Sequence, residues 1–600
     1  MIALLPAVPA AALENRLAGH PSPYLALHGA DPVAWQDWGP AVMAQARREN
    51  RLVYLSIGYF SCHWCHVMQR ESYQNAEIAE YINTHFIPVK IDRELDPALD
   101  ARMMEFVEAT RGMGGWPLNV FVTPDGHPLF ATLYHPPAEF LGIVRRVQER
   151  WREDSAGLAA LARSAAPPQP RGPGRPELDT ARVDRYREAL TTAALARADG
   201  VHGGFGEQSK FPMVPQLDFL LDELARRDRP DLRGFLLLTL DHMAGEGLQD
   251  HLGGGFFRYT VDPTWRTPHF EKMLYDNVLL GRLYLRAGRQ FGRDDYTRVG
   301  ERTFDFVLDV LRGDGGAYIA SLSALDDRDV EGGYYLWSAD ELARRLGKRD
   351  AEIYRLAWGM QDAPPFDAGW LPVRGLAPDL IAKRLALPEA EVVARLSRAE
   401  ATLRKARAVR GLPRDSKQLA AWNGLALGCL AEAARLTRSP RYRAAAGQLR
   451  DYLVRELWDG AELRRAVAGG RALGRVALED YAFVAWGLAE WAELSGVRAD
   501  AELAARVARS AWRRFHGKRG WRLIETPLIA AEPGQDVISD GPLAAPSATL
   551  AAASLKLAAR LQDPGLRRQA LAALNSGDAL IDGDPFWYAA TVAAMRAARE

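Results

Sequence analysis

The chain has 600 residues, 76 of them basic and 76 acidic, so its formal net charge at neutral pH is zero. A hydrophobic content of 48% and a charged content of 25% are typical of a globular protein, and the length indicates several domains. We therefore expect neither a nucleic-acid-binding protein nor a membrane-surface protein, since positive surface charge favours both, and no apolar run approaches the length of a membrane span.

Cysteine is scarce, with three residues in the whole chain. That number is too small for a disulfide scaffold, so we expect a protein of the reducing cytoplasm. Residues 2–13 are apolar and end in small residues, but they lack the basic region of a leader sequence. We expect an irregular start or a short helix there.

Two of the three cysteines lie in residues 61–66, which read Ser-Cys-His-Trp-Cys-His. The apolar residues 52–57 before them predict a buried strand, and a helical pattern follows over 67–81. A strand, a short loop and C-x-x-C at a helix start are typical of a dithiol redox site, because the helix N-terminus stabilises a thiolate. We predict Cys62 as the nucleophile and Cys65 as the resolving cysteine, while His63 and Trp64 tune the thiolate. As a cation, His63 would make the couple more oxidising.

Three other interpretations of this motif stay open. C-x-x-C-H is also the attachment signature of c-type haem, which requires export. Cys62 and Cys65 could hold zinc together with His63 and His66, although structural zinc sites usually have a second ligand pair at a distance. The two cysteines could also be half-buried residues without chemistry, as we expect for Cys429 in the apolar helical pattern of residues 425–434.

The downstream residues predict strands alternating with helices. Residues 87–92 and 118–122 read as buried strands, 128–131 as a hairpin return strand, and 96–110 and 137–151 as helices. This β-α-β-α-β-β-α order resembles the thioredoxin core, in which a cis-proline precedes the third strand and packs beside the dithiol. Pro117 holds that position, so we predict a cis bond between Trp116 and Pro117 and a role for Pro117 in shaping the substrate groove. A trans proline that opens a strand is the alternative.

The chain resembles the spermatogenesis-associated protein 20 family over most of its length. The resemblance rests on Asn-Arg-Leu at 15–17, Ser-Pro-Tyr-Leu at 22–25, His28, Asp-Pro-Val at 31–33, Trp35, and the strings at 62–68 and 114–118. Phe-Glu-Lys-Met-Leu-Tyr-Asp-Asn at 270–277 and Trp-Asn-Gly-Leu at 422–425 extend it into the second part. It implies a multidomain protein with an α/β thioredoxin-like domain and an all-α (α/α)6 toroid of the six-hairpin glycosidase type.

A composition change separates these two parts. Residues 166–177 are rich in Pro and Gly and have no apolar periodicity, which predicts a linker. We expect the thioredoxin-like domain at 1–165 and the toroid at 178–600. From about residue 178 onward helical patterns dominate, with roughly a dozen segments at the helical period.

Loops that combine glycine with an aromatic residue recur between these helices. They lie at 203–206, 253–257, 315–318 and 332–335, and their recurrence suggests a repeat architecture. In a helical-hairpin toroid such loops line the wide mouth of a funnel, and toroids of this kind commonly bind sugars through aromatic faces and carboxylates. Helix-ending glycines with an aromatic packed beneath them are the alternative.

Residues 256–277 concentrate polar and aromatic side chains and form the best candidate site of the toroid. The candidates are Arg258, Tyr259, Asp262, Trp265, His269, Glu271, Lys272, Tyr275 and Asp276, joined by Trp422 and Asn423 of a second inner helix, which Asp415 and Lys417 precede. We expect a helix to begin near Pro268 and to bring Lys272, Tyr275 and Asp276 together. A structural network of ion pairs and hydrogen bonds is the alternative, as is a buried tryptophan at 422.

Two segments depart from the pattern usual in the family. Residues 323–328 read Ser-Ala-Leu-Asp-Asp-Arg where relatives tend to show Asp-Ala-Asp-Ser after a serine, and residues 250–252 read Asp-His-Leu before a glycine run. Both changes fall where a sugar site of the toroid would lie. The sequence shows no carboxylate pair of the inverting or the retaining type.

Two functions of different classes follow. The first is a thiol–disulfide oxidoreductase that uses a redox-active disulfide, needs no other cofactor and acts on a protein thiol or disulfide client. The second is a carbohydrate-binding or carbohydrate-processing toroid, similar to an epimerase or hydrolase, with a small sugar-like ligand and a non-catalytic or metal-binding thioredoxin-like module. We expect no nucleic-acid or membrane partner, and the sequence does not indicate the oligomeric state.

Overall fold

The computed structural model describes residues 13–164, 178–518, 520–529, 539–576 and 578–599. The chain divides into two compact units, Met1–Pro168 with Thr526–Pro533 and Gln169–Glu525 with Gly534–Glu600. Residues 526–529, which the sequence analysis places in the toroid, therefore group with the first unit. Ile529 is 4% exposed and belongs to the hydrophobic core of that unit.

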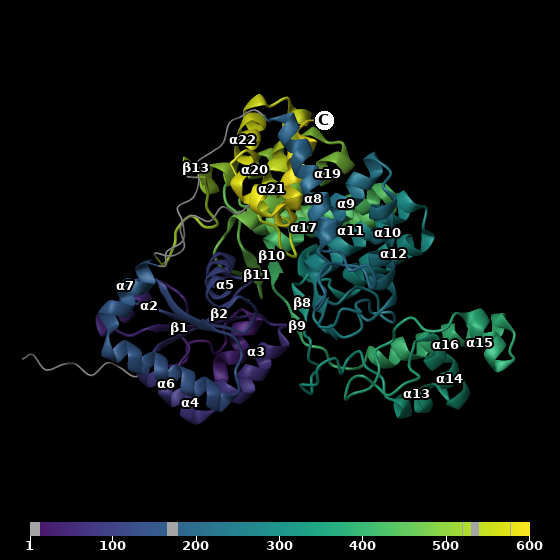
Figure 1. Cartoon of the computed structure of the whole chain (residues 1–600), viewed down its shortest axis with the longest axis horizontal. Coiled ribbons are helices and arrows are strands. Elements are labelled where there is room, and N and C mark those ends of the chain that lie inside the picture. The colour runs from purple at the N-terminus through teal and green to yellow at the C-terminus, as the bar shows by residue number, and fades with distance from the viewer. Residues whose placement is uncertain (1–12, 165–177, 519, 530–538, 577, 600) are drawn as a thin grey trace, which may run out of the picture. The chain divides into compact units, whose positions relative to one another are not determined.

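The first unit is built on a four-stranded sheet with the strand order β2-β1-β3-β4 (Figure 1). β1 (Val53–Gly58) runs parallel to β2 (Ile87–Asp92) and antiparallel to β3 (Leu118–Val122), which pairs with β4 (Pro128–Thr132). This is the predicted thioredoxin-like topology. The helices of the unit are α1 (Pro23–Leu27), α2 (Pro40–Glu49), α3 (His63–Met68), α4 (Ala76–His85), α5 (Pro97–Arg111), α6 (Pro137–Glu153) and α7 (Ser155–Ser164).

Alternation along the strands sorts side chains between the two faces of this sheet. Val53, Leu55 and Ile57 of β1 join the apolar residues of α2 and α5 in one core. Ser56 alternates with them and points to the opposite face. Lys90 of β2 is the register partner of Ser56 and lies on that same face, where its ammonium donates a hydrogen bond of 2.9 Å to the Ser56 hydroxyl.

The helix predicted over residues 67–81 is wrong in its bounds. α3 begins at His63 and continues as a π-helical turn, η2 (Gln69–Tyr73), and α4 then begins at Ala76. The break has a local cause. The Asn75 side chain accepts the backbone N–H groups of Glu77 and Ile78, so it caps a new helix where the apolar pattern alone indicated a continuous one.

Helices of the second unit form a closed ring. In ring order the inner helices are α9 (Val214–Arg226), α11 (Leu274–Phe291), α17 (Ala420–Thr437), α19 (Leu478–Ser495), α21 (Pro546–Leu561) and α24 (Ala589–Ala597). Each contacts the next one, and α24 contacts α9, which closes the ring. Cys429 of α17 is fully buried in this layer, as the sequence predicts.

A second layer of helices lies outside the ring. The outer helices, each in contact with the inner helix of its pair, are α8 (Thr180–Ala196), α10 (Pro230–Gly245), α12 (Asp294–Val310), α18 (Pro440–Tyr452), α20 (Arg498–Phe515) and α22 (Pro564–Leu574). Because α8 pairs with α24, the first and last described helices of the unit complete the sixth hairpin. The unit is therefore an (α/α)6 toroid, and no helix within the described ranges is long and apolar enough to cross a membrane.

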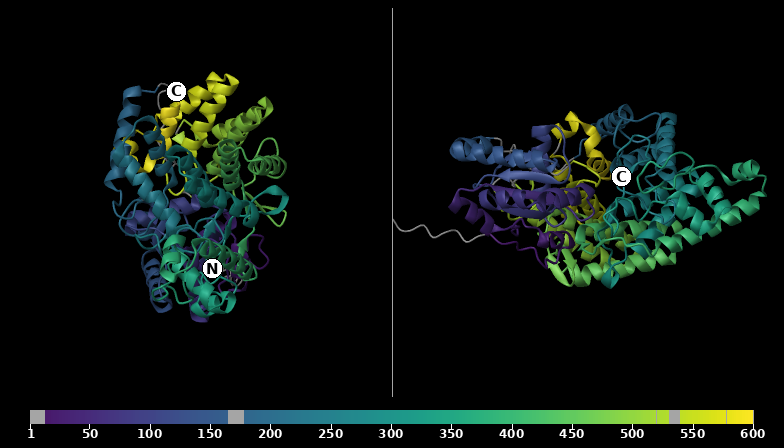
Figure 2. Two further views of the ribbon diagram at one scale, coloured as in Figure 1. Left: turned by 90° about the vertical axis from the view of Figure 1, so that its right-hand side faces the viewer. Right: turned by 90° about the horizontal axis from the view of Figure 1, so that it is seen from below.

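A group of helices is inserted between α12 and α17. It comprises α13 (Ala339–Leu346), α14 (Lys348–Ala357), α15 (Pro378–Leu385) and α16 (Glu389–Arg407), and Figures 1 and 2 show it in green beside the ring. Two apolar clusters hold it together, and one of them also includes Leu252 from the loop after α10. One further short helix, α23 (Asp578–Gly583), precedes α24.

Short strands lie in the connections between the helices of this unit. They are β5 (Tyr259–Thr260), β6 (Pro268–His269), β7 (Lys272–Met273), β8 (Ser321–Leu322), β9 (Arg414–Asp415), β10 (Gln418–Leu419), β11 (Ala466–Ala468), β12 (Arg471–Leu473), β13 (His516–Gly517) and β14 (Gly520–Trp521). The prediction that a helix begins near Pro268 is wrong. Residues 268–269 and 272–273 pair as strands with β5 and β8, so α11 begins only at Leu274.

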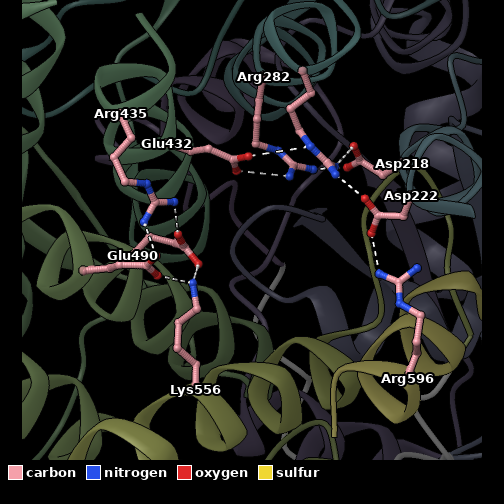
Figure 3. A network of polar contacts seen from close by, with 10 residues as sticks. Asp218, Asp222, Arg282, Glu432, Arg435, Glu490, Lys556 and Arg596 are labelled. Carbon is pink, nitrogen blue, oxygen red and sulfur yellow. Dashed lines mark hydrogen bonds and ion pairs between the residues drawn. The ribbon is translucent and has the colours of Figure 1, made fainter. Parts of the chain in front are cut away.

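Charged side chains of all six inner helices form a connected network, which we call the charged belt (Figure 3). It consists of Asp218 and Asp222 of α9, Arg282 and Arg286 of α11, Glu432 and Arg435 of α17, Glu490 and Glu493 of α19, Lys556 of α21 and Arg596 of α24. Around the ring, its ion pairs link α24 to α9, α9 to α11, α11 to α17, α17 to α19 and α19 to α21. Five acids thus balance five bases, which lets the toroid keep charges on its innermost helices.

Candidate functional site

The two cysteines of the C-x-x-C motif are joined in the structure. Cys62 and Cys65 form a disulfide with a Cα–Cα distance of 5.3 Å. Cys62 is the N-cap of α3, and its sulfur accepts a hydrogen bond of 3.1 Å from the backbone N–H of Cys65. Cys62 thus lies at the positive end of α3, where a thiolate is favoured.

The residues of the motif differ in exposure. Trp64 is 42% exposed, whereas Cys62 is 3% exposed and Cys65 is fully buried. The Trp64 ring lies 4.9 Å from that of Tyr134, whose hydroxyl donates a hydrogen bond of 2.5 Å to Glu71. A reactant that reaches this disulfide from outside therefore meets Cys62 rather than Cys65.

The two histidines of the motif hold different places. The His63 ring lies against Trp64 at a centroid distance of 5.4 Å. His66 is bound within its own loop, since its Nε2 lies 2.7 Å from the carbonyl oxygen of Phe60. Among the described residues, no group of three or more His, Cys, Asp or Glu side chains is arranged to hold a metal ion.

Pro117 lies opposite the end of β1, the strand that leads to the disulfide. The Trp116–Pro117 bond is cis, as the sequence predicts. Leu118 is the register partner of Ile57, so Pro117 stands opposite Gly58, four residues before Cys62. This places the cis-proline beside the loop that carries the nucleophile.

The Trp116 side chain is held by two residues that the sequence analysis did not single out. Its indole N–H donates a hydrogen bond of 2.8 Å to Asp100, and the Arg93 guanidinium lies 4.0 Å from its ring centroid. Arg93 also donates to Asp100 at 3.0 Å. Arg93 directly follows β2 and Asp100 lies on α5, so only the folded arrangement brings these two residues to Trp116.

The opening strings of the sequence build a buried polar cluster behind the sheet. The ring of His28 lies 2.6 Å from the Asp31 carboxylate, which also accepts 3.0 Å hydrogen bonds from Trp35 and Gln69. Burial, followed by the nearby Lys90, lowers the pKa of His28 to about 3, so its ring is neutral. Burial alone would raise the pKa of Asp31, but these donors hold it below its usual value.

Lys90 lies at the centre of this cluster. It is 1% exposed, and its ammonium lies 4.6–5.3 Å from the ring centroids of Tyr24, Trp35 and Tyr73. Burial lowers the pKa of Lys90 to about 7, and the charge of Asp31 opposes that effect. Aromatic faces and one hydroxyl are therefore the groups that contact this ammonium where it is protonated.

Comparison with known proteins agrees with this arrangement. A family model described as Thioredox_DsbH, protein of unknown function (DUF255), matches residues 14–166. Spermatogenesis-associated protein 20 of Homo sapiens is 32% identical over 551 residues, 82% of this chain and 69% of the relative, and that of Mus musculus is 31% identical over 569 residues, 84% and 70%. The chain belongs to the spermatogenesis-associated protein 20 family.

Similarity to solved structures is lower in sequence. Cellobiose 2-epimerase from Spirochaeta thermophila is 14% identical and matches with a TM-score of 0.44, over 70% of this chain and 98% of that chain. The fold assignment for this member of the spermatogenesis-associated protein 20 family therefore rests on its own helix ring and sheet.

Most candidates in the toroid are committed to structural contacts. Arg258 and Glu271 form a buried ion pair of 3.2 Å. Asp262 accepts backbone N–H groups of its own loop, including that of Thr267 at 2.6 Å, and the indole of the buried Trp265 donates to the carbonyl of His202. These contacts favour the structural interpretation for this part of the segment.

The recurring glycine loops have a structural basis as well. The Lys272 ammonium donates to Asp250 at 2.7 Å and to the Gly254 carbonyl at 2.8 Å. Lys210 repeats the arrangement one hairpin earlier, with bonds to Asp199 at 2.9 Å and to the Gly203 carbonyl at 3.0 Å. Lys272 thus holds a glycine loop, and it does not share a helix face with Tyr275 and Asp276, which lie in the first turn of α11.

Three rings and a carboxylate at the start of the toroid remain candidates for a ligand site. His269 lies 2.9 Å from Glu331, 4.8 Å between centroids from Tyr259, and Tyr259 stacks on Phe211 at 4.5 Å. Burial would lower the pKa of His269, but the hydrogen bond to Glu331 raises it above its usual value. Glu331 and Phe211 lie far from His269 in the sequence, and no spacing signal pointed to them. The carbohydrate function stays a prediction.

The inner helix α17 carries the predicted residues Trp422 and Asn423 in its first turn. The rings of Trp422 and Tyr275 lie 4.8 Å apart, so α17 and α11 bring these two candidates together. Asn423 is fully buried and hydrogen-bonds the backbone of Tyr318. Before the helix, Lys417 and Asp415 form a fully buried ion pair of 2.7 Å.

The departures from the family pattern lie in ordered loops. Asp326 accepts the backbone N–H groups of Arg328 at 2.9 Å and Val330 at 3.0 Å and pairs with the Arg328 guanidinium. Asp250 accepts the hydrogen bond from Lys272 at the glycine loop. Beside Asp326 lies a cavity of about 570 Å³, lined by charged residues that include Asp326, Asp327, Arg328, Glu341, Arg345 and Arg410.

Proposed function

We propose that this protein is a thiol–disulfide oxidoreductase whose reacting atoms are the sulfurs of Cys62 and Cys65. The observation that carries the proposal is the disulfide at the start of α3, with the cis-proline level with the strand before it. The positive helix end favours the thiolate of Cys62 over that of Cys65. The partner is a protein that carries a thiol pair or a disulfide.

The exchange balances without another cofactor. A client thiolate attacks the Cys62 sulfur, a client–Cys62 disulfide forms, and the Cys62–Cys65 bond breaks with its electron pair on Cys65. A second client thiol gives its proton to solvent and attacks the client sulfur of the mixed disulfide, and Cys62 leaves as a thiolate. The client has then lost two electrons and gained a disulfide, and the protein holds two thiols. With a client disulfide the same steps run in reverse.

A redox titration of the full chain tests the proposal. The protein is poised in glutathione buffers, and free thiols at Cys62 and Cys65 are counted by alkylation and mass spectrometry. We expect a reversible two-electron transition between about −270 and about −120 mV. The absence of a reversible disulfide would overturn the proposal.

Single cysteine variants assign the roles. Cys65→Ser keeps the nucleophile and should accumulate a mixed disulfide with glutathione, whereas Cys62→Ser should not. The matched control is Cys429→Ser, because Cys429 is fully buried and burial raises the pKa of its thiol to about 12. A Cys62→Ser variant with undiminished exchange would contradict the assignment of the nucleophile.

A further inference from the structure

A tyrosine hydroxyl lies beside the buried sulfur of the disulfide. Gly58 ends β1, and a Cβ added there would lie 2.3 Å from the hydroxyl oxygen of Tyr24 and 2.8 Å from the sulfur of Cys65. The oxygen and the sulfur therefore flank one small volume that the missing side chain of Gly58 leaves open. Any other residue at position 58 would place carbon between them.

That hydroxyl has no hydrogen-bond partner within the described ranges. Tyr24 is 1% exposed, and its oxygen is buried. A buried hydroxyl without a partner costs about 1–3 kcal/mol, and a state in which the hydroxyl is paired recovers that cost. A disulfide sulfur is a weak acceptor, but a thiolate on the same atom carries a full charge and accepts strongly.

We propose that the Tyr24 hydroxyl is the hydrogen-bond donor to the Cys65 sulfur in the reduced protein. This inference rests on the proposed exchange reaction. When a client thiolate attacks Cys62, the electron pair of the broken S–S bond passes to Cys65, and the Tyr24 O–H donates to the thiolate that forms. In the reverse direction the same bond holds the Cys65 thiolate in place until it attacks Cys62. Tyr24 keeps its proton throughout.

The surroundings of Tyr24 favour this donor role. Burial, with further contributions from Tyr73, Asp92 and Asp31, raises the pKa of Tyr24 well above its usual value, so the phenol is not ionised at neutral pH. The other titratable groups against its ring are Lys90, at 5.3 Å, and the neutral His28, at 5.2 Å. Lys90 adds positive charge on the side of the sheet where the Cys65 thiolate would form.

The test is the redox equilibrium of the full-length Tyr24→Phe variant against glutathione. Removing the donor should destabilise the reduced form and shift the equilibrium toward the disulfide by about tenfold, which is about 30 mV for a two-electron couple. The thermal stability of the oxidised variant should equal or exceed that of the parent, because the removed hydroxyl is unpaired in that state.

The matched control is Tyr54→Phe. Tyr54 is a buried phenol on β1, the strand that Gly58 ends, but its hydroxyl donates to Asn119 at 2.7 Å. Its loss should lower stability and leave the redox equilibrium unchanged. An unshifted equilibrium in Tyr24→Phe, or equal shifts in the two variants, would overturn the inference while leaving the oxidoreductase function intact. No reversible couple in the parent would instead remove the function itself.

Discussion

The buried Lys90 shows how strongly one side chain can be shaped by its surroundings. A lysine out of water usually either pairs with a carboxylate or loses its proton. Here the ammonium has one hydroxyl and three aromatic faces, and burial brings its pKa down from 10.5 to about 7. In the unfolded chain the same group keeps its proton up to about pH 10. Between these two pH values the unfolded state holds more protons than the folded state, so the free energy of unfolding rises with pH. The contribution of Lys90 to stability is therefore complete above pH 10.5 and is lost as the pH falls through 7.

The Lys90→Met variant should therefore be more stable than the parent, and its advantage should depend on pH. Methionine fills the aromatic cage without a charge to desolvate. We expect a rise in melting temperature of about 5 °C or more at pH 6 that shrinks toward pH 9.5, measured by calorimetry of the full chain. Lys383→Met, at a position with an exposed side chain, is the control and should show no such trend. An advantage of Lys90→Met that is equal at every pH would contradict the explanation.

At the scale of elements, the toroid repeats one way of starting an inner helix. Asn277 and Asn423 are each the fourth residue of their helix, α11 and α17. Asn277 accepts the N–H of Phe256 at 2.7 Å and donates to its carbonyl at 3.1 Å. Asn423 does the same to Tyr318, at 2.8 and 3.0 Å. Each asparagine thus fixes the aromatic residue of a glycine loop against the first turn of an inner helix.

Asn277→Ala and Asn423→Ala should destabilise the protein by similar amounts. Each substitution leaves a buried backbone N–H and a buried carbonyl without their partner, at an expected cost of about 2–4 kcal/mol. The measurement is the denaturant midpoint of unfolding, with Glu352→Ala on an exposed face of α14 as the control that should change by less than about 0.5 kcal/mol. If only one asparagine mattered, the two helix starts would not be equivalent.

The sequence predicts those features of the molecule that local patterns encode. The β1 strand and the C-x-x-C motif at a helix start follow from runs of a few residues, and the cis-proline at 117 follows from the resemblance to the thioredoxin core. The start of α11 does not, because Lys272 and Met273 pair with Ser321 and Leu322, almost fifty residues away. The same holds for the contact between His269 and Glu331 and for the approach of Tyr24 to Cys65, since only the fold brings such distant residues together.

At the scale of the whole toroid, the charged belt ties the last inner helix, α24, to the first, α9. Arg596 of α24 lies 2.5 Å from Asp222 and 3.3 Å from Glu223, and both carboxylates are on α9. The contact between α24 and α9 closes the ring. Burial would raise the pKa of Asp222, but Arg286 and Arg596 hold it below its usual value of 3.8. The stabilisation from this carboxylate is therefore present above about pH 4 and lost as the pH falls further.

The closing contact can be tested beside a matched control three residues away. Arg596→Met leaves two carboxylates of α9 short of a partner, and we expect a loss of about 2–4 kcal/mol in unfolding free energy. Arg599→Met removes an ion pair with Asp184 whose side chains are 34% and 51% exposed, so the expected loss is below about 1 kcal/mol. Thermal unfolding of both variants measures the difference, which should shrink below about pH 4 as Asp222 takes up a proton. Equal losses in the two variants would mean that the ring is closed by apolar packing of α24 against α9 and that the belt adds little to it.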